Sequence, residues 1–404
     1  MWFSAIYNPH AMTELTLINA QGQHFSYRLQ GREPIQAQSH VAFNRVAYSA
    51  AHVVANPRVD HDPWLDCAID WDATLQYRHH LWSMGLGVAE AMDTAQRGMG
   101  LDWPTSLELI QRCLAEAQHV PGARVASGCG TDHLLPSPGL TLDDVVRAYE
   151  TQMEAIEKHG GRLIIMASRA LVQVARSPAD YEQVYHRILS QAQHPVILHW
   201  LGDMFDPALK GYWGSDSVEA AMQTALGVIQ AHAHKVDGIK VSLLSKAHEI
   251  ALRRQLPDGV RMYTGDDFNY PELIAGDGIG RHPVNQYSDA LLGIFDVIAP
   301  AANLALAALA AGQVDRFHDI LSPTVALSRH IFQAPTRFYK TGVVFMAWLN
   351  GHQSHFSMVG GQQSARSVIH LCELFQLADQ AQLLRNPDAS AQRMRHLLQT
   401  WGIA

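Results

Sequence analysis

A single lysine stands inside an apolar run that has the pattern of a short buried strand. Residues 237–242 read DGIKVS, so Lys240 is flanked by isoleucine and valine. In such surroundings desolvation disfavours the charged ammonium and lowers its pKa, which leaves a neutral amine able to attack a carbonyl carbon. The position also suits a structural lysine whose stem packs in the interior while its head pairs with Asp266 or Asp267. The sequence is consistent with both roles.

Several other polar side chains follow apolar runs and can contact a ligand. Carboxylate, imidazole, guanidinium and hydroxyl groups hydrogen-bond a sugar-like molecule well in a partly dry pocket, and an aromatic ring can stack on a sugar ring. Taken singly, each aspartate, serine or threonine also suits a helix N-cap. The candidate ligand-binding residues of this kind are Thr131, His133, Ser168, Arg169, Trp200, Asp203, Asp266 and Asp267.

Eight short apolar or small-residue runs alternate with stretches of helical periodicity, and these elements must position the polar residues. The alternation predicts an α/β fold, a (β/α)8 TIM barrel, in which catalytic residues lie at the C-terminal ends of the strands. A doubly wound sheet is the alternative, but the first run, VAYSAAHVVANP, lacks the glycine-rich phosphate turn of that fold. The predicted strands lie within residues 45–55, 84–91, 124–130, 162–168, 195–202, 237–242, 260–267 and 277–281.

Two further segments flank the predicted barrel. Residues 1–44 contain a loose alternation around a Gln-Gly-Gln turn, which predicts an N-terminal extension with a hairpin. The predicted barrel itself occupies residues 45–285. Residues 286–404 have almost wholly helical periodicity and predict a C-terminal helical bundle packed on the barrel. We expect this bundle to cover the barrel mouth or to support oligomerisation.

The order of these motifs resembles the dihydrodipicolinate synthase and N-acetylneuraminate lyase superfamily of class I aldolases. The chain reads PVILHW, then DGIKVS, then YTGDDFNYPELIAGDGIG, and ends in a helical tail. In that superfamily the sixth strand carries GIK with a Schiff-base lysine, the seventh reads close to SGDD, and the eighth ends close to GADGVIS. The resemblance covers roughly residues 45–400, and the chain is similar to a divergent branch with a longer N-terminus. It implies that Lys240 forms an imine with the substrate.

Three positions depart from the pattern of the superfamily. Its fifth strand ends in a proton-relaying tyrosine, whereas ILHW places His199 there, and an imidazole can do the same acid and base work near neutral pH. Its Gly-Thr-Thr-Gly-Glu motif holds the carboxylate of a 2-oxo acid, whereas residues 85–90 read GLGVAE, which leaves Gly87, Glu90 and backbone N–H groups. The arginine after the relay strand is also absent from LGDMFDP. These losses favour a keto sugar or keto polyol over pyruvate, although a 2-oxo acid stays open.

Two other functions stay open beside the Schiff-base lyase, which itself needs no cofactor. A metal-dependent sugar lyase, isomerase or epimerase on the same barrel requires imidazole and carboxylate ligands for a divalent metal ion. No HExxH motif or paired histidine spacing supports such a site. The other function is a barrel that binds a sugar-like ligand without chemistry. The residues that can supply metal ligands are His52, His61, His133, His199, Asp203 and Glu90.

Composition limits the partners of the protein. The chain has 404 residues, is 48% hydrophobic and 17% charged, and carries a formal net charge of -8 with its 30 basic residues scattered. It therefore lacks the basic patch expected for binding to nucleic acid or to an anionic membrane. The N-terminus MWFSAIYNPHAM lacks a signal-peptide pattern, and four distant cysteines form no CxxC pair, which suits the reducing cytoplasm. We expect a cytoplasmic enzyme with a small, sugar-like carbonyl substrate and, by the resemblance, a homo-oligomer, either a dimer or a tetramer.

Overall fold

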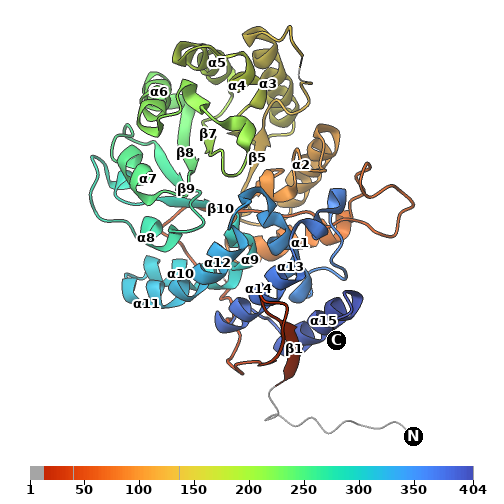
Figure 1. The fold of residues 1–404 in the computed structure, drawn as a ribbon. Coiled ribbons are helices and arrows are strands. Elements are labelled where there is room, and N and C mark those ends of the chain that lie inside the picture. Colours follow the sequence, from red (N-terminus) through yellow and green to blue (C-terminus); the bar gives the residue numbers. More distant parts are fainter. Residues whose placement is uncertain (1–12, 40, 136, 404) are drawn as a thin grey trace, which may run out of the picture.

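The computed structural model describes residues 13–39, 41–135 and 137–403. At its centre eight parallel strands form a closed barrel in the order β10-β3-β4-β5-β6-β7-β8-β9, with helices between the strands (Figure 1). The predicted (β/α)8 TIM barrel is therefore confirmed. Its strands are β3 (Ala47–Ala50), β4 (Gly87–Glu90), β5 (Val125–Cys129), β6 (Arg162–Ile165), β7 (Val196–Leu201), β8 (Val236–Ser242), β9 (Arg261–Thr264) and β10 (Asp289–Leu292).

Burial on both faces explains why the strand sequences are apolar throughout. Every residue of β3, β4, β5, β7 and β10 is buried. One set of alternate side chains points into the lumen and forms an apolar cluster of its own, while the other set packs against the surrounding helices. The lumen is thus a packed core, and polar chemistry is confined to the strand ends. The lumen cluster consists of Tyr48, Ala50, Ala89, Met92, Ala126, Ile164, Ile197, Tyr263 and Leu291.

The outer helices begin at residues typical of helix N-termini. Asp70, Asp102, Thr141 and Ser217 each accept a hydrogen bond from a backbone N–H of the first turn. Each cap fixes the residue at which the chain leaves a loop and enters a helix. With η for 3-10 helices, the elements between the strands are α1 (Trp71–Ser83), η1 (Asp93–Ala95), α2 (Trp103–Ala117), α3 (Leu142–Glu157), α4 (Arg169–Val174), α5 (Pro178–Gln191), η2 (Pro207–Leu209), η3 (Tyr212–Gly214), α6 (Val218–Ala231), η4 (Ala233–Lys235), α7 (Lys246–Arg253), α8 (Tyr270–Ala275) and η5 (Pro283–Asn285).

Further helices follow the barrel and form the predicted C-terminal bundle. Helix α13 lies at its centre, since all 11 of its residues are buried. It contacts η1 and α9, which follow the C-terminal ends of β4 and β10, so the bundle covers the barrel mouth. Within the described ranges no helix is long and apolar enough to cross a membrane. The helices are α9 (Ile294–Val297), α10 (Ala299–Ala310), α11 (Val314–Leu321), η6 (Ser322–Thr324), α12 (Val325–Ile331), η7 (Thr336–Phe338), α13 (Tyr339–Leu349), η8 (Val359–Ala365), α14 (Val368–Gln380) and α15 (Pro387–Thr400).

The N-terminal hairpin packs on the C-terminal helices. β1 (Glu14–Ile18) pairs antiparallel with β2 (His24–Arg28), and β1 lies beside α14 and α15 (Figure 1). The Tyr27 hydroxyl donates to Asp379 Oδ2 at 2.7 Å, and the Gln30 N–H donates to the same oxygen at 2.9 Å. The hairpin therefore joins the two ends of the described chain. Residues 1–12 of the predicted extension lie outside the described residues.

The eighth strand lies later in the chain than the sequence predicts. Residues 277–281 form a loop, because Gly276 and Gly278 adopt positive φ angles of 81° and 70° that end helix α8 and turn the chain. The strand is instead β10, whose residues DALL read as part of the helical region because they run almost directly into α9. The barrel therefore extends to Leu292, and the predicted boundary at residue 285 falls inside it.

Asp289 links the last strand of the barrel to the first. Its Oδ1 accepts a hydrogen bond from the Val46 N–H at 2.7 Å, and its Oδ2 pairs with Arg261 Nη1 at 2.7 Å. The Asp289 side chain is only 2% exposed. One buried carboxylate thus connects the chain entering β3 to the start of β9, while β10 pairs with both strands.

Replacing Asp289 by alanine should lower the free energy of unfolding by about 2 kcal/mol, because a backbone N–H and a guanidinium lose their partner. Urea unfolding followed by circular dichroism measures the loss. Asp258→Ala is the control, since the Asp258 side chain is 78% exposed, and it should change the free energy by less than about 0.5 kcal/mol. Equal effects of the two substitutions would contradict a closing role for Asp289.

Candidate active site

Lys240 lies in the wall of the barrel near its mouth. It belongs to β8, its Cα partner in β7 is His199, and its side chain is buried with 7% exposure. Burial lowers the pKa of Lys240, although the carboxylates of Asp93 and Asp267 oppose this shift. Among the described residues no ion pair joins Lys240 to Asp266 or Asp267, although the charge of Asp267 acts on its pKa. The amine is therefore placed to act as a nucleophile.

His199 lies beside Lys240 on the neighbouring strand. Its imidazole is buried, with Nε2 3.4 Å from the Ser242 hydroxyl, and its Nδ1 has no hydrogen-bond partner in the part of the chain that the structure describes. Burial, together with the charge of Lys240, holds the pKa of His199 well below its ordinary range. The neutral ring thus has a nitrogen that can accept a proton.

The two aspartates after β9 have different roles. Asp267 is 3% exposed, and its Oδ1 accepts a hydrogen bond from the Ile294 N–H at 2.9 Å. Burial raises the pKa of Asp267 to about 7, against the opposing effects of the Ile294 amide and Lys240. Asp266 instead shapes the turn, because its carboxylate accepts the backbone and side-chain N–H groups of Asn269 at 3.1 and 2.8 Å. Of the two aspartates after β9, Asp267 is therefore the one whose charge acts on Lys240, in addition to that of Asp93.

A cavity of about 290 Å³ opens at the mouth, and His199 lines it, whereas Lys240, Asp266 and Asp267 are not among its lining residues. Its volume is at the lower end of the range typical of small-molecule sites. Of the residues predicted from the sequence, His199, Thr131 and Arg169 are brought together in its wall. Groups of both charges line it, so it can hold a molecule with many hydroxyl groups. The polar lining residues are Asp93, Arg97, Thr131, Asp132, Arg169, Gln173, His199 and Asp206.

The lining residues that were not predicted from the sequence include Asp93 and Arg97. Arg97 is only 5% exposed. Its guanidinium donates two hydrogen bonds to the Asp132 carboxylate, from Nη2 to Oδ1 at 2.6 Å and from Nε to Oδ2 at 3.1 Å. It also donates to the Gln152 side-chain oxygen at 2.5 Å. These contacts hold a cation rigidly in the cavity wall. The available sequence signal is position, since both residues follow the end of a predicted strand, as the other candidates do.

Thr131, Ser168 and Arg169 lie at the ends of two adjacent strands, β5 and β6. The hydroxyls of Thr131 and Ser168 are 2.6 Å apart, and Arg169 Nε pairs with Asp206 Oδ2 at 2.6 Å. Ser168 Oγ also accepts the Leu171 N–H at 3.0 Å and so caps helix α4. Thr131 and Arg169 therefore face the cavity, whereas Ser168 has the N-cap role that its residue type also predicts.

His133, Trp200 and Asp203 line other cavities. His133 Nδ1 lies 2.8 Å from the Gln152 amide nitrogen, and the residue lines a shallow neighbouring cavity. Trp200 is 4% exposed and packs edge-on against Trp213, with ring centroids 6.4 Å apart. Trp200 and Asp203 both line a separate cavity of about 100 Å³. The structure does not bring these three residues to the mouth cavity.

Gly87 and Glu90 also lie away from the mouth cavity. Gly87 begins β4 at the N-terminal end of the barrel, where the Tyr48 ring lies against it. Glu90 pairs with Arg78 through two contacts of 2.8 and 2.9 Å, and both side chains are fully buried. Residues 85–90 thus run into and along β4, and the segment that reaches the mouth after this strand is 91–95. Gly87 and Glu90, which were predicted from the match to a carboxylate-binding motif, therefore lie in the strand before the segment that reaches the mouth.

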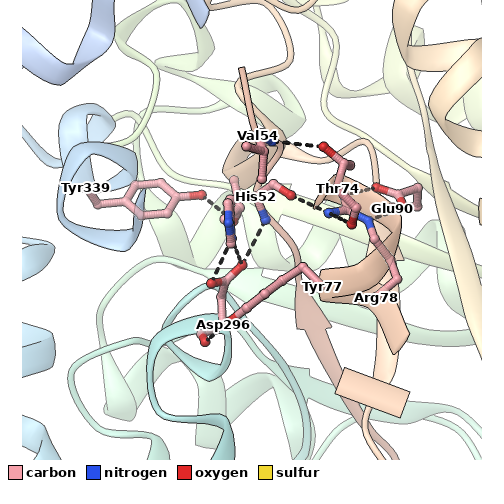
Figure 2. Close-up of polar contacts among 9 residues, drawn as sticks. His52, Val54, Thr74, Tyr77, Arg78, Glu90, Asp296 and Tyr339 are labelled. Atoms are coloured by element: carbon pink, nitrogen blue, oxygen red, sulfur yellow. Dashed lines mark hydrogen bonds and ion pairs between the residues drawn. The ribbon is translucent and has the colours of Figure 1, made fainter. Parts of the chain in front are cut away.

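Figure 2 shows a buried polar network around His52, at the C-terminal ends of β3 and β4. His52 follows β3, and its Nδ1 lies 2.8 Å from Asp296 Oδ2, which also accepts the His52 N–H at 2.8 Å. The Tyr77 hydroxyl donates to the Asp296 carbonyl at 2.6 Å. The hydroxyls of Thr94 and Tyr339 lie 2.8 Å apart. These contacts tie the ends of β3 and β4 to α1, α9 and α13.

The predicted metal ligands do not converge. Within the described ranges, no group of three or more histidine, cysteine, aspartate or glutamate side chains is arranged to hold a metal ion. Three of the predicted ligands line three different cavities, and a fourth, Glu90, is held by Arg78. His52 is engaged by Asp296, and His61 lies with its Nδ1 against a backbone carbonyl of its own loop. Metal dependence stays a prediction without a site among these residues.

Comparison with known proteins agrees with this architecture. A family model described as "Protein of unknown function (DUF993)" matches residues 15–403. The chain belongs to this family. No curated protein matched it in a sequence comparison.

Solved structures similar to this DUF993 protein are dihydrodipicolinate synthases and their relatives. The synthase of Bacillus anthracis matches with a TM-score of 0.59 and 15% identity, over 85% of this chain and 98% of its own. YagE of E. coli K12, a prophage protein of the dihydrodipicolinic acid synthase family in complex with pyruvate, matches with a TM-score of 0.60 and 12% identity over 90% and 100%. The synthase of Aquifex aeolicus matches with a TM-score of 0.58 and 11% identity over 89% and 98%. The shared fold confirms the resemblance over most of the chain.

In this DUF993 protein, replacing Glu90 by glutamine should lower the free energy of unfolding by about 3 kcal/mol, because Arg78 becomes an unpaired buried charge. Chemical denaturation measures the loss. Glu108→Gln breaks an exposed pair with Arg112 and should change the free energy by less than about 1 kcal/mol. A loss of ligand affinity at unchanged stability would instead place Glu90 in a binding site.

Proposed function

We propose that the protein is a class I lyase of the aldolase type. The observation that carries the proposal is a buried lysine with a lowered pKa beside a neutral histidine at the mouth of a TIM barrel. The likeness in fold to dihydrodipicolinate synthases supports the same kind of chemistry.

The reaction begins when Lys240 Nζ attacks the carbonyl carbon of a ketone, and loss of water gives an iminium ion. The positive nitrogen withdraws electrons from the neighbouring carbons. The bond between the carbon next to the iminium carbon and the following carbon can therefore break to leave an enamine, or form in the reverse direction. His199 takes the proton of the hydroxyl group that becomes the aldehyde product and returns it to the enamine carbon. Hydrolysis of the imine then releases the ketone product and restores the amine. No cofactor takes part in these steps.

The mouth cavity favours a neutral, hydroxyl-rich ketone, such as a keto sugar or keto polyol. Both of its arginines are already paired, Arg97 with Asp132 and Arg169 with Asp206. The carboxylate of a 2-oxo acid would compete with these aspartates, whereas hydroxyl groups can bond to both partners of each pair. The Thr131 hydroxyl adds a further donor and acceptor in the same wall.

The proposal also includes the setting of the enzyme. We propose a cytoplasmic homo-oligomer, a dimer or tetramer, that acts on a small molecule. Light scattering of the purified chain measures the number of subunits.

Borohydride reduction in the presence of a keto sugar should trap a covalent adduct on Lys240, because the reagent reduces an imine to a stable amine. Pyruvate and a panel of keto sugars serve as trial ketones, and peptide mass spectrometry locates the adduct. Mapping matters because burial lowers the pKa of Lys340 to about 8, although the Asp93 carboxylate opposes this shift.

Lys240→Ala should abolish both the adduct and turnover, and the Lys246→Ala control, at an exposed residue, should retain them. An adduct on Lys340 alone, or no adduct with any ketone, would reject Lys240 as the nucleophile.

The rate of trapping should rise with pH, because only the neutral amine attacks. Its midpoint should lie below about 10.4, the pKa of an ordinary lysine, because burial lowers the pKa of Lys240. Asp267→Asn removes a negative charge that favours the ammonium and should move the midpoint to lower pH. The asparagine oxygen can still accept the Ile294 N–H, so the turn is kept. Asp258→Asn is the exposed control, and a midpoint that moves to higher pH in Asp267→Asn would refute this role.

A further inference from the structure

The N-terminal end of the barrel holds a cavity that the proposed reaction does not use. It has a volume of about 590 Å³ and forms where the strands begin. Strand β8 runs from Asp237 at this cavity to Lys240, a distance of about 10 Å at about 3.3 Å per residue. The apolar lumen cluster fills the barrel between the two ends. The cavity is therefore separate from the mouth.

Three arginines meet at this cavity. Arg124 precedes β5, Arg162 begins β6 and Arg261 begins β9, and the parallel register places all three at the same end of the barrel. The Arg124 guanidinium lies over the Tyr48 ring, 5.9 Å from its centroid. Burial raises the pKa of Tyr48, and all three arginines oppose that shift. The charges of all three arginines thus act on the Tyr48 hydroxyl, in the wall of the cavity.

The arginines are only partly neutralised by protein groups. Arg261 is held in an ion pair with Asp289 at 2.7 Å. Arg124 donates only to a backbone carbonyl, at 3.3 Å, and the Arg162 side chain has no hydrogen-bond or ion-pair partner among the described residues. Asp237 lines the cavity, but its carboxylate already accepts a tyrosine hydroxyl at 2.6 Å. Two guanidinium groups are left with N–H donors for a ligand.

We propose that this cavity binds a small anion with two or more negative charges, carried by phosphate or carboxylate groups. A guanidinium matches both groups with paired N–H donors, and the Tyr48 hydroxyl can add one more donor. The volume is within the range of small-molecule sites. The chain as a whole carries a net charge of -8, so the attraction is local to the cavity and does not extend over a surface as nucleic acid requires.

Isothermal titration calorimetry of the full chain with inorganic phosphate and with citrate, at an ionic strength held constant with sodium chloride, tests the proposal. Saturable binding of at least one anion is expected, and the tighter of the two shows whether phosphate or carboxylate groups are recognised. Arg124→Gln and Arg162→Gln should each weaken binding about tenfold, because each removes charge-assisted hydrogen bonds. Arg316→Gln removes the same charge from an exposed position on α11 and should keep the original affinity.

Absence of saturable heat with both anions overturns the proposal, and so does an equal weakening in Arg316→Gln. Arg162 is exposed at the start of its strand, so its replacement should leave the melting temperature unchanged. Arg162→Lys provides a second measurement, since it keeps the charge but loses the paired donors. It should weaken binding less than Arg162→Gln, and a loss as large as that of the glutamine variant would argue against recognition by charge.

Discussion

Closure of the barrel is the constraint on which the rest of the structure depends. Strand β10 must pair with β3 as well as with β9, and the Asp289 carboxylate joins the chain entering β3 to Arg261 at the start of β9. A closed parallel barrel has no free edge and gathers the C-terminal ends of all its strands in one ring. Side chains that point into this ring lose most of their contact with water. Desolvation at the mouth therefore follows first from topology, and the helices that cover the mouth add to it.

Desolvation in turn sets the protonation of the site. The burial that lowers the pKa of Lys240 also lowers that of His199 and raises that of Asp267. All three shifts favour the neutral forms, which are the forms that the proposed reaction needs of a nucleophilic amine and a base. In the proposed reaction the amine would become a positive iminium ion, Asp267 could then ionise nearby, and a site that excludes water would make their attraction strong. Each group acts through its effect on the others.

The sequence predicts the features that local pattern determines. Lys240 is found because one lysine interrupts an apolar strand, and His199 because a polar residue ends another. Side chains alternate between the two faces of a strand, and this alternation explains the position of Glu90. Ala89 points into the lumen, so the next side chain points outward to a helix. Seven of the strands were located in this way, and β10 was not, because DALL runs into α9 without a turn signal.

Residues that depend on distant contacts leave no local pattern. Arg97 enters the cavity wall because Asp132 holds it there, 35 positions along the chain. Tyr339 reaches Thr94 across 245 positions, from a helix whose packing on the barrel no periodicity specifies. Such residues become visible only when the strand ends and the C-terminal bundle are placed in space.

The two ends of the barrel differ in how far they are covered. At the N-terminal end Arg162 begins its strand exposed to solvent. At the mouth α13 lies across the strand ends, and Lys340 on that helix has its own pKa lowered to about 8 by burial. Burial thus lowers the pKa of both Lys240 on β8 and Lys340 on α13. A barrel with the same strands but without α13 would leave the mouth more open to water, and the pKa of Lys240 would lie closer to its ordinary value.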